Sequence, residues 1–272
     1  MKKMLFLLLA VLAAVPTFSQ KIFEDDKVMI DKIEDGSYKI SYLDAPNYAA
    51  IYVIEGQQRA LVIDTGDKKD VDVATLIRKC TDKPYVMALT HTHGDHTGAI
   101  DQFAELYVNA KENQRQLQNS YKGQVHFIED GYQFDLGGRT VQAFEITGHT
   151  NGGMIFADEA TGNCYVGDCF GTGQVWLQIS PSDHPISEYL TQVKKMLTLM
   201  EKHHIVHIYT GHYGQEDCIY GINYIQDMAT LAQNMLDGHY QSVHHNRSAE
   251  TSPTQMTQLR RAVIVFNPEK VR

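Results

Sequence analysis

Short stretches of alternating apolar and polar residues fill the first quarter of the chain, a pattern that predicts strands with one buried face. The turn Glu34-Asp35-Gly36-Ser37 interrupts this alternation, and an acidic residue followed by glycine is typical of a hairpin turn. Residues 55–58 interrupt the next pair of apolar stretches in the same way. The hairpins predicted from these turns cover residues 28–43 and the pair 49–54 with 60–63.

The rest of the chain mixes short apolar runs with helical spacing. The residues from Ser187 to Met200 carry an apolar stripe at i, i+3, i+4 and i+7, which predicts an amphipathic helix. The other predicted helices are 70–79, a helix beginning at 97–104, 111–118 and 219–236. The predicted strands are 84–90, 125–128, 154–156, 164–166, 205–209 and 262–266, with a hairpin over 134–146. This periodicity indicates a mixed α/β domain.

The N-terminus has the pattern of a secretory signal peptide. Lys2 and Lys3 precede the apolar run 4–15, and the small residues Thr17 and Ser19 occupy the −3 and −1 positions of a cleavage site. A membrane span needs roughly 20 apolar residues, more than this run offers. We therefore expect a signal peptide over residues 1–19, one domain over 20–272, and a periplasmic or secreted protein without a stable membrane anchor. An uncleaved anchor is the alternative.

Removal of residues 1–19 leaves 22 lysines and arginines against 33 acidic residues, a formal charge of −11. That balance disfavours nucleic acid and anionic lipid as partners, because both are recognised by basic surfaces. A small-molecule substrate is compatible with it, since bound metal ions dominate the local charge of a site. The sequence does not determine the oligomeric state.

The chain has four cysteines, for which an oxidising compartment permits disulfides. Three complete pairings of Cys80, Cys164, Cys169 and Cys218 are available, and the sequence does not choose among them. Cys169 directly follows Asp168, and neighbours at a strand end face opposite sides. We expect Cys169 to be a structural thiol, with a disulfide or a metal contact as the alternatives.

Three imidazoles and a carboxylate gather in the six residues His91-Thr92-His93-Gly94-Asp95-His96. Neutral imidazole and carboxylate groups suit zinc-like divalent ions. The preceding apolar run, 84–90, places them at the carboxyl end of a strand, where open α/β sheets usually hold their sites. His91 and His93 alternate and can converge on one ion, whereas Asp95 and His96 lie further round the turn and can serve a second.

This motif resembles the signature of the metallo-β-lactamase-fold hydrolase superfamily, and four further family motifs follow the same order along the chain. Asp64 ends the apolar run 60–63, His149 stands in a Gly-His-Thr context, Asp168 in a Gly-Asp pair and His212 in a Gly-His pair. The resemblance implies a four-layer αββα sandwich, in which two mixed β-sheets are flanked by helices. The ligand motifs would then meet on loops at one edge of the sandwich.

The resemblance also implies a ligand set for two Zn²⁺ ions, with Fe or Mn as alternatives in one or both sites. The first ion would be held by His91, His93 and His149. The second would be held by Asp95, His96 and His212, with Asp168 bridging the two. Two such ions acidify a shared water and provide a bridging hydroxide for attack on a carbonyl group.

Two aspartates have further roles under this resemblance. Asp95 is the candidate catalytic residue, which would steer the nucleophile or pass a proton to the leaving group. Asp64 is interpreted as orienting a metal ligand by hydrogen bonding. A cap on the turn that follows its strand is the alternative for Asp64.

Departures from the family's subgroups narrow the chemistry. Metallo-β-lactamases of the common type have Cys where this chain has Asp168, and they lack a His at the position of His96. The full ligand set is similar to those of glyoxalase II, acyl-homoserine lactonases and tRNA-processing nucleases. The acidic segment 213–217 lacks the basic residues with which glyoxalase II binds glutathione, and nuclease activity conflicts with export and charge.

An exported dinuclear zinc hydrolase of an ester, thioester or lactone is therefore the leading hypothesis. The alternatives are an iron-dependent thiol or persulfide oxygenase, a β-lactamase, and a binding module without turnover. The aromatic residues Trp176, Tyr213 and Tyr220 are candidates for the wall of a substrate pocket. Core packing is the alternative for Trp176, as it is for Tyr224.

Overall fold

The computed structural model describes residues 19–43, 48–67, 70–177, 184–212, 219–245 and 253–271. Its largest sheet has eight strands that lie side by side in chain order, antiparallel from β1 to β5 and parallel from β5 to β8. These strands are β1 (Gln20–Glu24), β2 (Val28–Glu34), β3 (Ser37–Tyr42), β4 (Ala50–Glu55), β5 (Ala60–Ile63), β6 (Tyr85–Ala88), β7 (Glu105–Asn109) and β8 (Gln124–Ile128).

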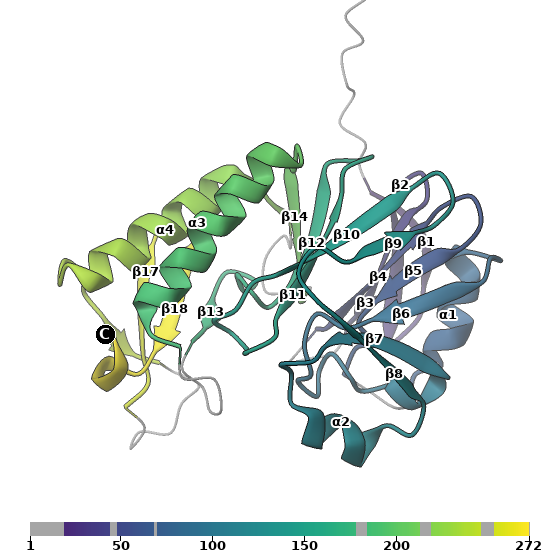
Figure 1. Ribbon diagram of the computed structural model, residues 1–272, viewed down its shortest axis with the longest axis horizontal. Helices are drawn as coiled ribbons and strands as arrows, with labels where there is room; N and C mark the ends of the chain where they lie inside the picture. The colour runs from purple at the N-terminus through teal and green to yellow at the C-terminus, as the bar shows by residue number, and fades with distance from the viewer. Residues whose placement is uncertain are drawn as a thin grey trace, which may run out of the picture.

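A second mixed sheet has the order β15-β14-β12-β11-β10-β9 and is parallel only between β12 and β14. Its strands are β9 (Gln133–Asp135), β10 (Thr140–Glu145), β11 (Met154–Asp158), β12 (Asn163–Gly167), β14 (His207–Thr210) and β15 (Ile219–Tyr220). Figure 1 shows this sheet in the middle of the molecule, beside the eight-stranded sheet.

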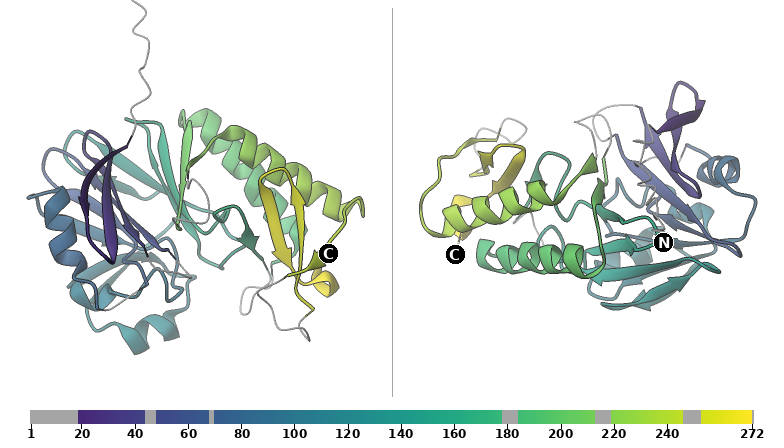
Figure 2. Two further views of the ribbon diagram at one scale, coloured as in Figure 1. Left: turned by 180° about the vertical axis from the view of Figure 1, so that it is seen from behind. Right: turned by 90° about the horizontal axis from the view of Figure 1, so that it is seen from above.

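Four α-helices flank the two sheets, and Figures 1 and 2 show them on opposite sides of the molecule. They are α1 (Val73–Cys80), α2 (Gln114–Ser120), α3 (Ile186–Lys202) and α4 (Ile222–Leu236), with 3₁₀ turns at Ile100–Gln102 and Pro268–Lys270. Asp72 accepts a hydrogen bond from the Thr75 N–H and so caps the N-terminus of α1.

Three buried clusters confirm the αββα layering. The cluster between the sheets joins inward side chains of β4 and β5, such as Tyr52 and Ile63, to Phe156 and Tyr165 of the second sheet. The outer face of the eight-stranded sheet packs against α1 and α2, and the outer face of the second sheet packs against α3 and α4. Each large apolar side chain buried in this way stabilises the fold by roughly 1.5–3 kcal/mol before entropy is counted.

A third, four-stranded sheet was not expected from the sequence. Its order is β13-β18-β17-β16, with β13 (Val175–Trp176), β16 (Val243–His244), β17 (Gln255–Leu259) and β18 (Ala262–Phe266). Figure 2 shows the β17–β18 hairpin beside α4. Only β18 has the apolar run that predicts a strand. The residues of β17 are largely polar and have no pattern that predicts a strand. Their antiparallel pairing with β18 places them in the sheet.

Two helix predictions need correction. The segment 97–104 forms only the 3₁₀ turn Ile100–Gln102, because the Gly98 N–H donates to the Gly66 carbonyl and Phe103 is already extended. The Gln102 side chain instead accepts from the Val73 N–H at the start of α1. The helix predicted from residue 219 begins after Gly221, since Ile219–Tyr220 pairs with β14.

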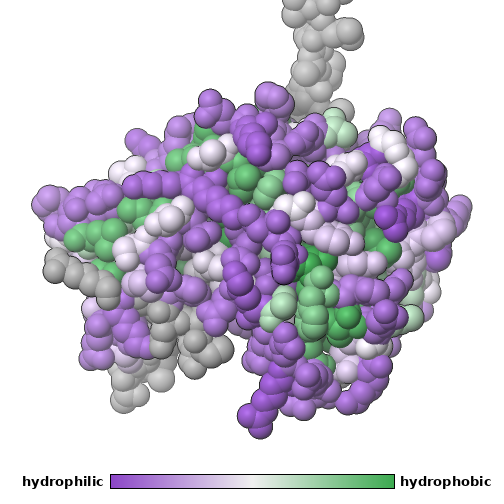
Figure 3. Space-filling view, in the orientation of Figure 1, coloured by the Kyte–Doolittle hydropathy of each residue, from purple (hydrophilic) through white to green (hydrophobic). Residues whose placement is uncertain are grey.

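The surface seen in Figure 3 is largely hydrophilic, with hydrophobic side chains gathered over β7 and β8 at the end of the large sheet. Phe127 of β8 is 53% exposed. Within the described ranges, the helices are all too short or too polar to cross a membrane.

Candidate metal centre

Three of the four loops that carry the predicted ligands follow a strand of a parallel pair, and so does the loop of Asp64. The loop of His149 instead follows β10, whose partners are both antiparallel. Asp64 follows β5, His91 follows β6, Asp168 follows β12 and His212 follows β14. The carboxyl ends of these strands meet at one edge of the sandwich, where sites of α/β proteins usually form. The two sheets are tied together there, because the Ala50 N–H donates to the Gly211 carbonyl at 2.9 Å.

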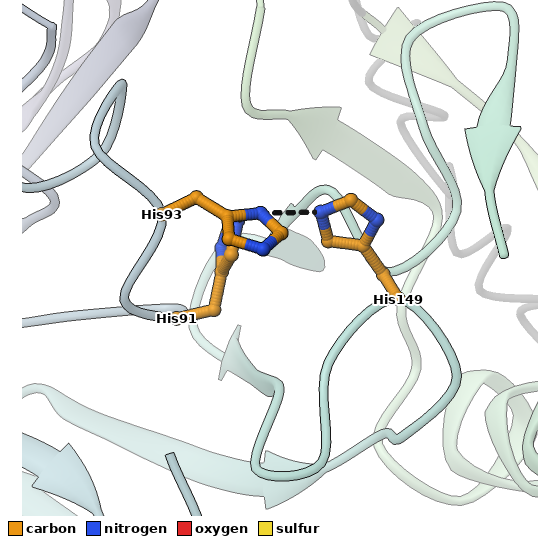
Figure 4. Close-up of side chains that lie close together, drawn as sticks. All are labelled: His91, His93 and His149. Atoms are coloured by element: carbon orange, nitrogen blue, oxygen red, sulfur yellow. Dashed lines mark hydrogen bonds between the residues drawn. The ribbon is translucent and has the colours of Figure 1, made fainter. Parts of the chain in front are cut away.

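The first group consists of His91, His93 and His149, which Figure 4 shows converging from two loops. His91 Nε2 lies 3.1 Å from His93 Nδ1, and His149 Nε2 lies 3.0 Å from the same atom. Histidine ring nitrogens are ligands of the kind that bind zinc.

The second group consists of Asp95, His96, Asp168 and His212. Asp168 Oδ2 lies 3.1 Å from His212 Nε2 and 3.6 Å from His149 Nε2, so this carboxylate stands between the two groups. Asp95 Oδ2 lies 3.7 Å from His212 Nε2, and its side chain is 25% exposed. Every residue predicted as a metal ligand is thus brought to one place.

The buried polar atoms of this centre fit metal ions. His96 Nε2 and Asp168 Oδ1 are buried and lie 3.5 Å from each other, and neither has a hydrogen-bond partner among the described residues. Buried polar atoms are nearly always bonded, so exceptions call for a ligand. In the first group, His93 Nδ1 faces His91 Nε2 and His149 Nε2 within 3.1 Å, so that a shared cation could accept a lone pair from each of the three rings. The donor set and its burial therefore suit zinc-type ions.

Protonation differs between the two groups. Burial lowers the pKa of the His91 ring well below its usual range, and the nearby imidazoles of His96 and His149 lower it further. Burial and the His149 ring lower the pKa of His93 to about 4. These two rings are therefore neutral at pH 7, the state in which imidazole binds a metal.

The two histidines of the second group have raised pKa values instead. Burial favours neutral His96, but the carboxylates of Asp64 and Asp168 outweigh it and raise the pKa of His96 well above its usual value. Burial likewise opposes ionisation of Asp168, yet His212 and His96 hold the pKa of Asp168 well below its usual range. Against its own burial, the charge of Asp168 raises the pKa of His212.

Asp64 has the orienting position expected of it. Its Oδ2 lies 2.8 Å from His96 Nδ1, and this contact leaves His96 Nε2 directed into the centre. The Thr90 N–H and hydroxyl donate to the two oxygens of Asp64 at 2.7 and 2.8 Å. Asp64 adopts a φ of +63°, a strained conformation for a non-glycine residue, and such strain is often found at functional sites.

His149 is oriented by the third sheet. Its Nδ1 donates to the Trp176 carbonyl at 2.8 Å, which leaves Nε2 for the first group. Trp176 belongs to β13, which pairs with β18, and its ring packs edge-on against the buried His245 at 4.3 Å. Sequence reasoning missed this role of Trp176, because it belongs to a backbone carbonyl.

The aromatic pocket candidates lie in different surroundings. Trp176 approaches the centre through its carbonyl, while its ring contacts His245. Tyr220 is buried, stacks on Tyr224 and pairs with Ile208 near the start of β14, whereas His212 follows the end of that strand. Tyr213 lies outside the described residues, as does Cys218.

Cys169 is a buried structural thiol. Its Sγ donates to the Ile146 carbonyl at 3.4 Å, and burial raises the pKa of the thiol well above its usual value. Cys80, Cys164 and Cys169 are all free, so no disulfide joins any two of these three described cysteines.

The fold is an αββα sandwich, and two adjacent groups of His and Asp side chains lie at one edge of it. This combination is typical of proteins that hold metal ions at that edge. The chain belongs to the metallo-beta-lactamase superfamily, whose profile matches residues 45–202. That range includes β4 to α3 and six of the seven predicted ligands, with only His212 beyond it.

Several curated proteins are similar in sequence. The lactamase-like protein ptaB of Pestalotiopsis fici is 34% identical over 121 residues, 43% of this chain and 38% of that protein. A hydroxyacylglutathione hydrolase of Gloeothece citriformis is 30% identical over 146 residues, 50% of this chain and 55% of that protein. An acyl-coenzyme A thioesterase of Gallus gallus is 23% identical over 211 residues, 63% of this chain and 75% of that protein. The chain thus spans well under half the length of the fungal relative.

Solved structures share the fold. The metallo-β-lactamase FIM-1 of Pseudomonas aeruginosa, in its mono-zinc form, superposes with a TM-score of 0.61 at 18% identity, covering 77% of this chain and 96% of that one. A metallo-β-lactamase of Erythrobacter litoralis gives a TM-score of 0.60 at 15% identity, covering 78% and 99%. About a fifth of this chain therefore lies outside the fold shared with them.

Proposed function

We propose that the chain is a dinuclear zinc hydrolase that cleaves an ester, thioester or lactone bond of a small molecule. The observation that carries this proposal is the position of Asp168, whose Oδ2 lies within 3.6 Å of both His149 Nε2 and His212 Nε2. A carboxylate that lies between two groups of potential metal ligands is the arrangement that would hold two ions side by side. Zinc ions held by these residues would supply an acidified water as the nucleophile and would stabilise the negative charge that develops on the carbonyl oxygen.

The side chains of the chain itself divide the remaining work. Asp64 accepts from His96 Nδ1 and so keeps the other nitrogen of that ring aimed at the centre. Asp95 is partly exposed beside His212, which allows it to exchange a proton with the leaving group and with solvent. Hydrolysis of a thioester then yields a carboxylate and a thiol.

Similar proteins favour the thioester among the three bond types. The fungal relatives include an atrochrysone carboxyl ACP thioesterase of Aspergillus terreus, 33% identical over 121 residues, and the Gallus gallus relative is named as an acyl-coenzyme A thioesterase. β-Lactam hydrolysis is disfavoured by Asp168, which stands where the common metallo-β-lactamases have Cys, and by the structural position of Cys169.

A substrate panel tests this function. Chromogenic esters, thioesters, lactones and a cephalosporin are assayed with and without chelator, together with metal analysis of protein purified without added metal. Chelator-sensitive thioester or ester hydrolysis with zinc bound is the expected result. If the purified protein holds iron and consumes oxygen when given a thiol or persulfide, the hydrolase proposal is wrong and the protein is an oxygenase.

We also propose that residues 1–19 are a signal peptide and that residues 20–272 act as one domain in the periplasm or outside the cell. The pattern around Thr17 and Ser19 supports this, as does the beginning of β1 at Gln20. Mass spectrometry of the protein from its native cell envelope should give Gln20 as the first residue. A retained N-terminus would indicate a membrane anchor instead.

A further inference from the structure

The side chain of Glu112 lies buried between the two loops that carry the first ligand group. Glu112 follows β7, and only 5% of it is exposed. Its Oε2 accepts hydrogen bonds from the Thr92 N–H at 3.0 Å and from the Thr92 hydroxyl at 2.8 Å. Its Oε1 accepts from the Gly152 N–H at 3.0 Å. One carboxylate thus joins two loops that are distant in sequence.

Both anchor points stand next to ligands. Thr92 lies between His91 and His93, and Gly152 is three residues beyond His149. Gly152 permits the close approach, because a Cβ there would lie 2.8 Å from the Glu112 backbone nitrogen and 3.1 Å from its Cγ. A buried carboxylate is stabilised by such donors, and hydrogen bonds to a charged acceptor are the strong ones.

We propose that Glu112 is a positioning residue, which fixes the loop of His91 and His93 relative to the loop of His149 and thereby sets the affinity of the first group for its metal ion. This inference rests on the proposed function only in requiring that the centre binds zinc-type ions. The second group has its own anchor, because Asp64 holds His96. Loss of an outer partner of metal ligands typically lowers metal affinity about 10–100-fold.

The substitution Glu112→Gln keeps the size of the side chain but removes one of its two acceptor oxygens, so it tests the hydrogen bonds to the two loops alone. Glutamine has one acceptor oxygen, so its NH₂ group must face either the Thr92 N–H or the Gly152 N–H, and both are donors. One loop then loses its anchor while the volume is kept. We expect zinc affinity of the first group to fall about 10–100-fold. A His212→Ala background isolates the first group, and a chromogenic chelator competes for the ion.

The matched control is Glu145→Gln. The Glu145 carboxylate accepts hydrogen bonds from Lys111 Nζ and Asn109 Nδ2, beside Glu112, whereas the Glu112 carboxylate accepts from Thr92 and Gly152. The Glu145→Gln variant should bind zinc with the affinity of the wild type. The absorption spectrum of the Co²⁺-loaded protein adds a direct report on ligand geometry, which should change for Glu112→Gln and not for Glu145→Gln.

Thr92→Val provides a second test that does not depend on the folding of Glu112→Gln. This substitution removes the Thr92 hydroxyl, which donates to Glu112, and keeps the backbone N–H, which also donates to it. Zinc affinity should therefore fall, but by a smaller factor than in Glu112→Gln.

Unchanged zinc affinity and an unchanged Co²⁺ spectrum in Glu112→Gln, with a lower melting temperature of the metal-free protein alone, would overturn the positioning role. A wild-type chain that takes up no zinc would overturn the proposed function, and this inference with it.

Discussion

The two ligand groups differ at the residue scale in the protons that they carry without metal. His91 and His93 are neutral because burial lowers the pKa of both rings, that of His93 to about 4. His96 and His212 bind protons more readily, because Asp64 and Asp168 raise the pKa of His96, and Asp168 raises that of His212, against their burial. A proton competes with a metal ion for the same lone pair, so the second group must release protons to bind.

Acidification should therefore release the ion of the second group first. As the pH falls but stays above about 4, protons compete with metal for His96 and His212, whose pKa values are raised, while His93 stays deprotonated. Dialysis at stepped pH followed by zinc analysis measures this, with His149→Ala and His212→Ala identifying the group that is emptied. Loss of the first-group ion at the higher pH would contradict the assignment.

Asp95 and Cys169 should respond oppositely to isosteric substitution. Asp95→Asn keeps the shape but removes the proton-handling carboxylate beside His212, so kcat should fall by about 10²–10⁴-fold. Cys169→Ser should be nearly silent in kcat, because this thiol is directed to the Ile146 carbonyl. Steady-state kinetics on the best substrate of the panel checks both. Loss of turnover in Cys169→Ser with tolerance of Asp168→Asn would indicate a lactamase-like Cys site.

At the element scale, the ends of β12 and β14 approach each other so closely that only glycine fits. A Cβ on Gly211 would lie 2.6 Å from His96 Cε1 and 2.7 Å from Asp168 Oδ1. The Gly211 N–H donates to the Gly167 carbonyl, which prevents an easy retreat of the strand end. Steric crowding therefore explains why glycine precedes His212 in the Gly211-His212 pair.

Gly211→Ala should displace ligands of the second group and lower zinc content from two ions toward one. Gly94→Ala is the matched control inside the first motif, since a Cβ there would meet nothing within 4 Å. Zinc analysis of both purified variants gives the result. Two ions retained in Gly211→Ala would show that the strand ends can shift without cost to the centre.

The sequence predicted most elements and brought together the ligand set, because strand alternation and short ligand motifs are local signals. Glu112 and Thr90 were missed since their roles arise only from contacts between distant loops, such as Glu112 with Gly152. The third sheet was missed for a related reason. Residues 255–259 have little apolar alternation, and their pairing with β18 decides their structure.

At the scale of the whole molecule, the C-terminal segments support a centre that lies in the family's common fold. β18 pairs with β13, and β13 presents the Trp176 carbonyl to His149. Residues after 202 lie outside the range matched by the family profile. The first ligand group therefore depends on strands that the sequence pattern alone did not connect to it.

Metal content of the purified protein tests the central claim most directly. The wild-type chain, purified without added metal and analysed by mass spectrometry of its elements, should hold about two zinc-type ions per chain, and His212→Ala and Asp168→Ala should hold fewer. The reason is that Asp168 lies between the two groups and His212 completes the second. One iron per chain in the wild type, or two ions retained in Asp168→Ala, would contradict the account.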